Sequence, residues 1–164
     1  MELMMRKQLR RLLTAAVGAI VATTALIAPA SSASAAYPTC NSWTTLRPSS
    51  GYVFHIPSLG RNSGNYLCQL ELYDGYNGGG AQSAVFVLQG SLNSCHQAGL
   101  TQDGKYGPLT RNAVTWIYRS VGLPDPPEGV GVYTQIAMVF AIKWLGQRQV
   151  GGETRTTCLH YLAI

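Results

Sequence analysis

Apolar residues recur at three- and four-residue spacing in three stretches of the second half of the chain. This spacing places side chains on one face of an α-helix, and it predicts helices over residues 82–94, 108–121 and 134–145. The faces expected to be buried are Val85, Leu88, Leu92 and Cys95 in the first helix, Leu109, Ala113, Trp116 and Ile117 in the second, and Ile136, Ala137, Phe140 and Trp144 in the third. No helix or strand is predicted for residues 147–164.

Residues 37–77 have a different pattern, rich in proline, glycine, serine and threonine. Two short β-like runs, residues 51–56 and 66–73, flank a turn-rich segment and predict an irregular β-hairpin. Glycines at Gly75 and at Gly78, Gly79 and Gly80 mark a flexible join. We therefore place a boundary between an N-terminal extension, residues 36–77, and a helical domain, residues 78–164.

The first 35 residues have the pattern of a secretory signal peptide. Four basic residues precede an apolar core over residues 12–27, and a small-residue run ends in Ala33-Ser34-Ala35. We predict cleavage after Ala35, with Ala36 as the alternative site. The mature protein is then secreted, with possible retention in the cell wall, and has no membrane span. Because Arg10 and Arg11 are adjacent, the general and twin-arginine export routes both stay open.

Removal of this segment changes the charge of the chain. The predicted signal peptide carries four of the twelve basic residues and one of the seven acidic residues, which leaves a mature net charge of +2. A balance this mild does not indicate a nucleic-acid-binding protein. The mature length suits one domain with an extension, and we expect a monomer.

All four cysteines lie in the mature chain. An even number of cysteines in a small exported protein indicates two disulfides, for which three pairings are possible. We favour Cys40–Cys68, which would close the N-terminal segment on itself, and Cys95–Cys158, which would tie the first helix to the C-terminus. The other pairings stay open at this point.

The stretch over residues 100–116 combines a tight turn with the start of a helix. Asp103-Gly104 is a strong turn dipeptide, because Gly adopts positive φ freely and Asp bonds nearby backbone N–H groups. Gly107-Pro108 follows, and proline suits the first helical turn because its missing N–H is not needed there. Thr110 lies near the helix start, where a hydroxyl can cap. All five residues are therefore predicted to shape the turn, and Asp103 is assigned that role rather than a catalytic one.

A shorter copy of this unit precedes the third predicted helix, with Glu128-Gly129, Gly131 and Thr134 at matching positions. Repetition of a turn–helix unit lets two units bury their apolar faces against each other. The chain as a whole therefore predicts a mainly α fold. We expect a three-helix bundle built from the turn–helix repeat, with a disulfide-tied N-terminal β-hairpin or irregular extension.

Two segments carry a resemblance to a known family. Residues 85–93, Val-Phe-Val-Leu-Gln-Gly-Ser-Leu-Asn, and residues 100–114, with Asp-Gly-Lys-Tyr-Gly-Pro-Leu-Thr at their centre, resemble the first type of peptidoglycan-binding domain. The resemblance covers roughly residues 83–144. It implies a three-helix domain whose ligand is peptidoglycan, of a kind found on cell-wall hydrolases and in small secreted actinobacterial proteins. The chain departs from the family pattern at Ile117-Tyr118, where Phe-Gln is usual, and in the second copy, where Glu128-Gly129 replaces Asp-Gly.

Ligand contacts are expected near the turn rather than from the turn residues themselves. Aromatic rings stack on sugar faces, and phenol groups can bond sugar hydroxyls, whereas arginine can bind a stem-peptide carboxylate. Trp116 and Trp144 are expected to lie in the core, because both fall on apolar helix faces. The candidates for contact with the glycan strand or the stem peptide are Tyr106, Tyr118, Tyr133 and Arg111.

The sequence offers no catalytic centre. His55, His96 and His160 lack the spacing of a metal site, and no Gly-x-Ser-x-Gly nucleophile motif occurs. We therefore expect no metal and no cofactor, and we favour a secreted, non-catalytic peptidoglycan-binding protein. The first alternative is a secreted inhibitor or protein-interaction module that uses residues 37–77 for its contacts. A cell-wall hydrolase with an unrecognised site ranks last.

Overall fold

The computed structural model describes residues 37–124, 133–134 and 137–164 of the chain. These residues belong to one structural unit. The predicted signal peptide and its cleavage site lie outside the described residues, as do Ile136 and, in the second copy of the turn, Glu128, Gly129 and Gly131.

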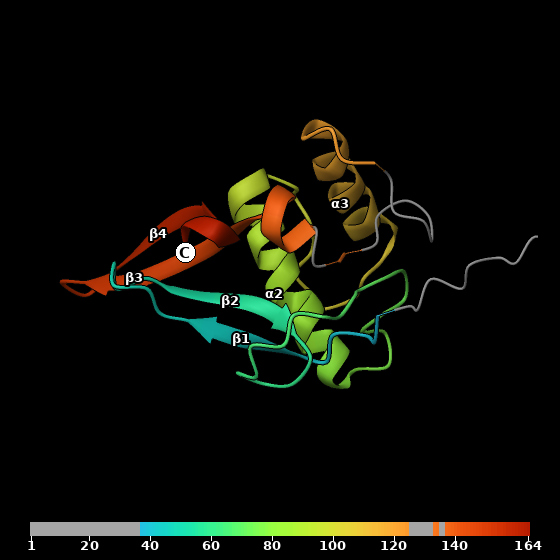
Figure 1. Cartoon of the computed structure of the whole chain (residues 1–164), viewed down its shortest axis with the longest axis horizontal. Helices are drawn as coiled ribbons and strands as arrows, with labels where there is room; N and C mark the ends of the chain where they lie inside the picture. The colour runs from blue at the N-terminus through green and yellow to red at the C-terminus, as the bar shows by residue number, and fades with distance from the viewer. Residues whose placement is uncertain (1–36, 125–132, 135–136) are drawn as a thin grey trace, which may run out of the picture. The chain divides into compact units, whose positions relative to one another are not determined.

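A four-stranded antiparallel sheet forms the framework, with the strands in chain order β1-β2-β3-β4. The strands are β1 (Ser42–Leu46), β2 (Val53–Ser58), β3 (Lys143–Val150) and β4 (Glu153–His160). In the central pairing, Phe54 of β2 lies opposite Gly146 of β3. The β3–β4 hairpin extends beyond the other elements (Figure 1). Its turn is Gly151-Gly152, where both residues have the positive φ that a two-residue hairpin turn requires.

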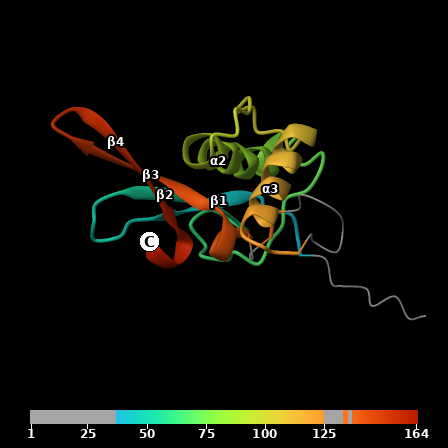
Figure 2. The same cartoon turned by 90° about the horizontal axis from the view of Figure 1, so that it is seen from above.

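One α-helix packs against this sheet, and a second packs against the first. Helix α2 (Gly79–His96) contacts β1, β2 and β3 along its length, and α3 (Pro108–Ser120) follows through the turn that contains Asp103. Figure 2 shows α2 beside the strands, with α3 next to α2. A single π-helical turn, η1 (Ala137–Ala141), leads into β3, and the chain ends in the 3-10 turn η2 (Tyr161–Ala163).

The prediction of a mainly α three-helix bundle is therefore wrong. Helices predicted over residues 82–94 and 108–121 are present as α2 and α3. The third predicted helix is replaced by η1 and the first residues of β3. In β3, Trp144 and Gly146 are buried while Lys143 and Gln147 are exposed, an alternation that sets two sheet faces and cannot be read from helical spacing.

The N-terminal hairpin was also predicted with the wrong partner. Strand β2 overlaps the predicted strand over residues 51–56, but it pairs with β1 rather than with residues 66–73. That second segment contributes isolated bridges at Gln69 and Leu70 only. Cys68 and Leu70 of this segment are fully buried in the core, whereas Leu67 and Tyr73 are exposed.

Strands from both predicted regions enclose one hydrophobic core. It joins residues of the N-terminal part, such as Phe54, Ile56 and Leu70, to Leu88 of α2 and Trp144 of β3. Because β1 and β2 belong to the same sheet as β3 and β4, residues 36–77 and 78–164 share both the sheet and the core.

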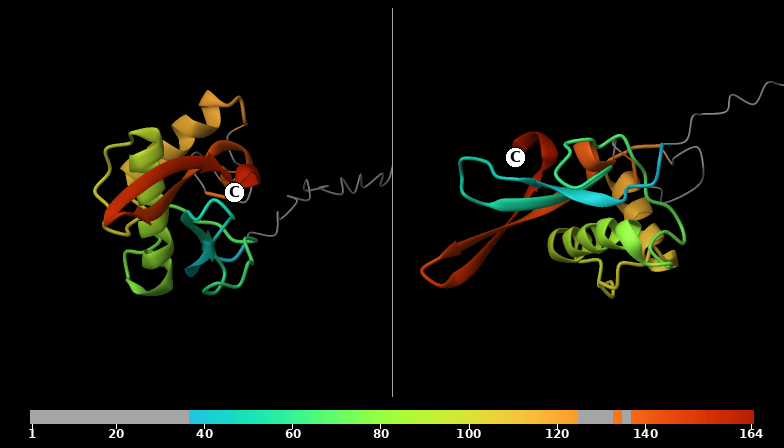
Figure 3. Two further views of the ribbon diagram at one scale, coloured as in Figure 1. Left: turned by 90° about the vertical axis from the view of Figure 1, so that its left-hand side faces the viewer. Right: turned by 90° about the horizontal axis from the view of Figure 1, so that it is seen from below.

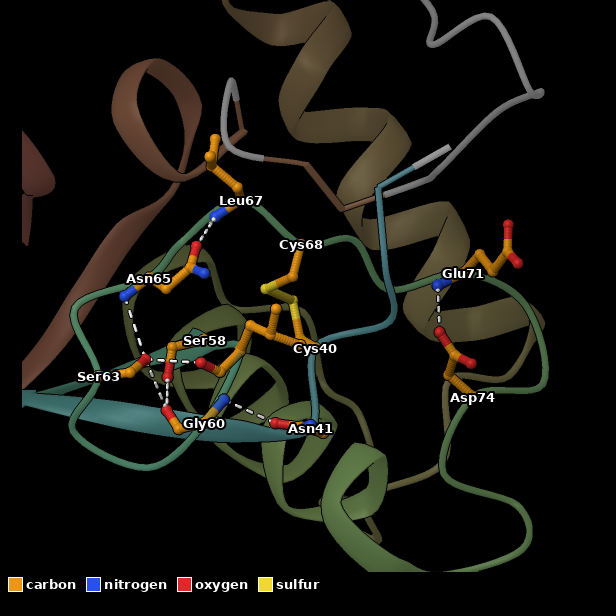
Figure 4. Close-up of a disulfide and its surroundings, with 11 residues drawn as sticks. Cys40, Asn41, Ser58, Gly60, Ser63, Asn65, Leu67, Cys68, Glu71 and Asp74 are labelled. Atoms are coloured by element: carbon orange, nitrogen blue, oxygen red, sulfur yellow. Dashed lines mark hydrogen bonds between the residues drawn. A yellow bond between two sulfur atoms is a disulfide. The ribbon is translucent and has the colours of Figure 1, made fainter. Parts of the chain in front are cut away.

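Both favoured disulfides are present. Cys40–Cys68 is fully buried and fastens the chain before β1 to the segment after the loop at residues 59–65 (Figure 4). Cys95–Cys158 joins the last turn of α2 to β4. No cysteine of the described chain is unpaired. Two disulfides are compatible with a secreted protein.

The outer edge of β1 is covered by the loop after β2. The backbone N–H of Asn62 donates to the carbonyl of Trp43 at 3.0 Å, and its side-chain oxygen accepts the N–H of Thr45 at 2.9 Å. Asn62 adopts a left-handed φ of 51°, a conformation that Asn tolerates better than most residues. One residue therefore satisfies two backbone groups of an edge strand that would otherwise pair with another chain.

Candidate functional site

The turn between α2 and α3 is built around the buried side chain of Gln89. Its Nε2 lies 3.1 Å from Oδ1 of Asp103, 3.0 Å from the carbonyl oxygen of Lys105 and 3.2 Å from Oγ1 of Thr110. Its Oε1 accepts the backbone N–H of Gly104 at 2.8 Å. A single amide from α2 thus holds both sides of the turn and the first residues of α3.

Asn93, one turn further along α2, holds the start of the same segment. Its side-chain amide donates to the carbonyl of Leu100 at 2.8 Å and accepts the N–H of Leu100 at 2.7 Å. The Leu-Gln and Leu-Asn pairs of residues 88–93 therefore place each apolar residue in the core and each amide on the loop.

Asp103 braces the turn. Its Oδ1 accepts the backbone N–H of Lys105 at 2.9 Å. That hydrogen bond, together with the one from Gln89, lowers the pKa of Asp103 below its ordinary value. The carboxylate is exposed, and its two hydrogen bonds hold the turn, as the sequence predicts.

Gly104 permits a close approach between the turn and α2. Its φ is +74°, and a Cβ placed there would lie 2.5 Å from Cγ of Gln82 and 2.7 Å from the Gln82 carbonyl. No other residue fits at this point without moving the helix or the turn.

The three tyrosines predicted to contact ligand lie in the core. Tyr106, Tyr118 and Tyr133 are at most 3% exposed, so their rings cannot stack on a sugar. The Tyr118 hydroxyl is 2.8 Å from Oγ1 of Thr134, and burial raises the pKa of all three phenols. The prediction of ligand contact is corrected for these residues, because all three belong to the buried core. Arg111 is half-buried beside Tyr106 and lies outside the grooves described below.

Helix α3 buries a different face from the predicted one. The buried residues include Thr110, Val114, Ile117 and Tyr118, whereas Leu109 is 70% exposed and Trp116 is 62% exposed. The expectation that Trp116 lies in the core is therefore wrong, while Trp144 is fully buried as expected. Two apolar stripes run along this short helix, and only one can face the core.

The exposed stripe of α3 lines a groove of about 570 Å³, here called the Trp116 groove. The other wall comes from the end of α2 and the segment that follows it. Its lining residues are His96, Gln97, Ala98, Gly99, Leu100, Leu109, Asn112, Ala113, Trp116 and Ile117. His96 is the one titratable side chain in that lining. Burial lowers its pKa, and its Nε2 accepts the backbone N–H of Lys143 at 2.9 Å, so the groove is uncharged at neutral pH.

A second groove lies between α2 and the sheet, here called the α2–sheet groove. One part, of about 480 Å³, is lined by Trp43, His55, Gln82, Ser83, Phe86, Val87 and Asp103. The adjoining part, of about 340 Å³, shares His55, Phe86 and Val87 and continues to Leu145 and Gln147 of β3. Figure 3 shows α2 lying beside the strands that form the other wall. Sequence reasoning did not single out Trp43, because β1 was not predicted. It also did not single out Phe86, which lies outside the predicted apolar face of its helix.

Within the described residues, no group of three or more His, Cys, Asp or Glu side chains is arranged to hold a metal ion. None of the described helices is both long and apolar enough to cross a membrane. Comparison of the chain with protein-family models, curated proteins and solved structures found no match.

Proposed function

We propose that the protein is a secreted, non-catalytic cell-wall-binding protein that holds the glycan strand of peptidoglycan in the Trp116 groove. The observation that carries this proposal is the 62% exposure of Trp116 on an apolar, uncharged groove. A large exposed aromatic ring is costly to leave in water, and such patches mark binding surfaces.

The lining chemistry suits an N-acetylated sugar. The Trp116 ring offers a face for the apolar side of a pyranose. Leu100, Leu109 and Ala113 surround it and can accept an acetyl methyl group, while the exposed Asn112 amide can bond sugar hydroxyls. A binding site of few polar groups in an apolar groove is the usual form for a small neutral ligand.

The groove is also held rigid by the turn. Gln89 and Asn93 fix residues 100–110 to α2, and α3 starts at Pro108. A preformed groove loses less conformational entropy when ligand binds. On this view the residues of the family-like motif support the site, while their neighbours Leu109 and Trp116 make the contacts.

Secretion is part of the proposal. It is supported by the signal-peptide pattern of the first 35 residues and by the two disulfides, which persist in oxidising compartments outside the cytosol.

The test is sedimentation of the protein with purified, insoluble peptidoglycan sacculi. We expect the wild-type protein to sediment with the sacculi, and Trp116→Ala to remain largely in the supernatant. Phe140→Ala removes another exposed aromatic ring, 59% exposed, outside both grooves, and serves as the matched control with wild-type binding. Thermal melts of all three proteins establish that they are folded. Equal sedimentation of wild type and Trp116→Ala would exclude the Trp116 groove as the site.

A further inference from the structure

The α2–sheet groove differs from the Trp116 groove in carrying charge of both signs. The carboxylate of Asp103 lines the larger of its two parts. At Trp43, which lines the same part, the guanidinium of Arg61 lies 4.9 Å from the centre of the indole ring. The groove therefore has an anionic residue in its wall and a cationic residue at its rim.

A second arginine reinforces the cationic side. Burial lowers the pKa of His55, and the positive charges of Arg47 and Arg61 lower it further. Both arginines thus act on the histidine that lies in both parts of the groove. On the anionic side, the Lys105 ammonium lies 5.7 Å from the centre of the Tyr76 ring, and Lys105 is not among the residues that line the groove.

Between the charges the groove is apolar. Phe86 is 48% exposed although it lies in the middle of α2, and Val87 lies beside it in the lining. Trp43 forms the facing wall, with its ring edge-on to His55 at a centroid distance of 6.2 Å. An exposed phenylalanine facing a tryptophan across a groove is suited to an apolar side chain.

We propose that the α2–sheet groove binds a short peptide that carries both a free α-carboxylate and a free α-ammonium group. The carboxylate lies toward Arg61, the ammonium toward Asp103, and an apolar side chain packs against Phe86 and Val87 of α2. This inference goes beyond the proposed function and uses none of the residues of the Trp116 groove.

Two features of the groove favour such a peptide over other ligands. Arg61 stacks over the Trp43 ring, so that ring is not an open platform for a sugar as Trp116 is. Asn62 occupies the backbone groups at the outer edge of β1, so a longer peptide cannot bind there by adding a strand to the sheet. Recognition is left to the charged termini and one side chain.

The experiment is a titration of the isotope-labelled mature protein with the tripeptide Ala-Leu-Ala, followed by NMR. We expect saturable shifts in the amide signals of His55, Phe86 and Val87. Acetylation of the peptide amine and amidation of its carboxylate should each weaken binding by about tenfold, because each removes one charge pairing. Phe86→Ala should also weaken binding, and Trp116→Ala should leave it unchanged, which separates this result from that of the sacculus assay.

Two charge variants separate recognition from general damage to the fold. Arg61→Gln should bind the free peptide and its amide equally, whereas Asp103→Asn should bind the free and acetylated peptides equally. A merely destabilised protein would lose affinity for all three peptides while keeping the differences between them. The proposal is overturned if no shift saturates, if wild type binds the three peptides equally, or if the neutral sugar tri-N-acetylchitotriose saturates the same amides in place of the peptide.

Discussion

Gln89 of α2 donates a hydrogen bond to Oδ1 of Asp103, 3.1 Å away in the following turn, from a side chain that is only 2% exposed. The same amide also bonds Gly104, Lys105 and Thr110. The folded position of the turn therefore depends on one buried polar group whose partners lie on both sides of it.

Replacing Gln89 with leucine should destabilise the protein by about 2–4 kcal/mol, since leucine leaves the N–H of Gly104 and the hydroxyl of Thr110 without their partner in the interior. Urea unfolding followed by tryptophan fluorescence measures this change. Gln147→Ala, at an exposed position of β3, is the control and should change the free energy of unfolding by under about 0.5 kcal/mol. Equal effects of the two substitutions would contradict the bracing role.

Gly104 and Gly99 form a matched pair for testing the contact between the turn and α2. Both have positive φ, +74° and +64°, so alanine carries a similar backbone cost at either position. Only at Gly104 would the new Cβ meet Gln82, whereas at Gly99 no atom lies within 4 Å. Gly104→Ala should therefore destabilise the protein by about 1–3 kcal/mol more than Gly99→Ala. Thermal melts of the two variants give the comparison, and equal melting temperatures would refute the close contact.

Asp103 should make the stability of the protein depend on pH in the acid range. Its folded-state pKa lies below the ordinary value, so the unfolded chain binds more protons near pH 4 and stability there rises with pH. The contribution is complete above about pH 4 and is lost as the pH falls through the folded-state pKa.

Asp103→Asn keeps an oxygen acceptor but removes this titration, so its stability should fall less steeply than that of wild type between about pH 4 and pH 2. Asp74, whose pKa burial raises, contributes with the opposite sign, but it is present in both proteins. Denaturant unfolding at a series of pH values gives the two curves. Parallel curves would show that Asp103 is not perturbed in the folded state.

The two disulfides should differ in their resistance to reductant. Cys40 and Cys68 are fully buried, whereas Cys95 and Cys158 are partly exposed. Mild reduction followed by alkylation and mass spectrometry should label Cys95 and Cys158 first. Opening this bond, which spans 63 residues, should cost about 4 kcal/mol on the chain-entropy model, against about 3.5 kcal/mol for the 28-residue separation of Cys40–Cys68. Labelling of all four cysteines at one rate would contradict the order.

The parts of the fold that could be predicted from the sequence are those that depend on neighbouring residues. Helix α3 begins at Pro108, as its turn residues indicate. Both helices of the family-like motif and the turn between them follow from spacing within about thirty residues, which propensity and periodicity describe well. The favoured disulfide pairing is also present, although the sequence left the other pairings open.

The sheet could not be predicted in the same way, because its pairings join distant segments. Strand β2 pairs with β3 through residues more than ninety positions apart in the sequence, such as Val53 and Gln147, and no local pattern specifies that partner. One local pattern did indicate the β3–β4 hairpin. Gly151-Gly152 lies between two eight-residue runs of mixed polar and apolar residues, which is typical of a β-hairpin. The helical spacing of Ala137, Phe140 and Trp144 masked it.

The exposed and buried faces of α3 were assigned the wrong way round from the sequence. Leu109 and Trp116 were assigned to the core, and Tyr118 to the surface, whereas the structure has the reverse. A tyrosine whose hydroxyl has a partner such as Thr134 is stable in the interior, so polarity alone does not identify the exposed stripe. That assignment requires knowledge of which elements, here η1 and α2, pack against α3.

The hydrogen bonds of Asn62 to the outer edge of β1 limit how copies of the protein can associate through their sheets. In the described part of the chain, the opposite edge of the sheet is β4, whose residues 153–156 are exposed. A chain with two open edges can add copies at both ends and grow into a fibre. Because the edge of β1 is already hydrogen-bonded to Asn62, two copies can pair only through β4. Such an assembly is therefore limited to two chains, with their β4 strands side by side.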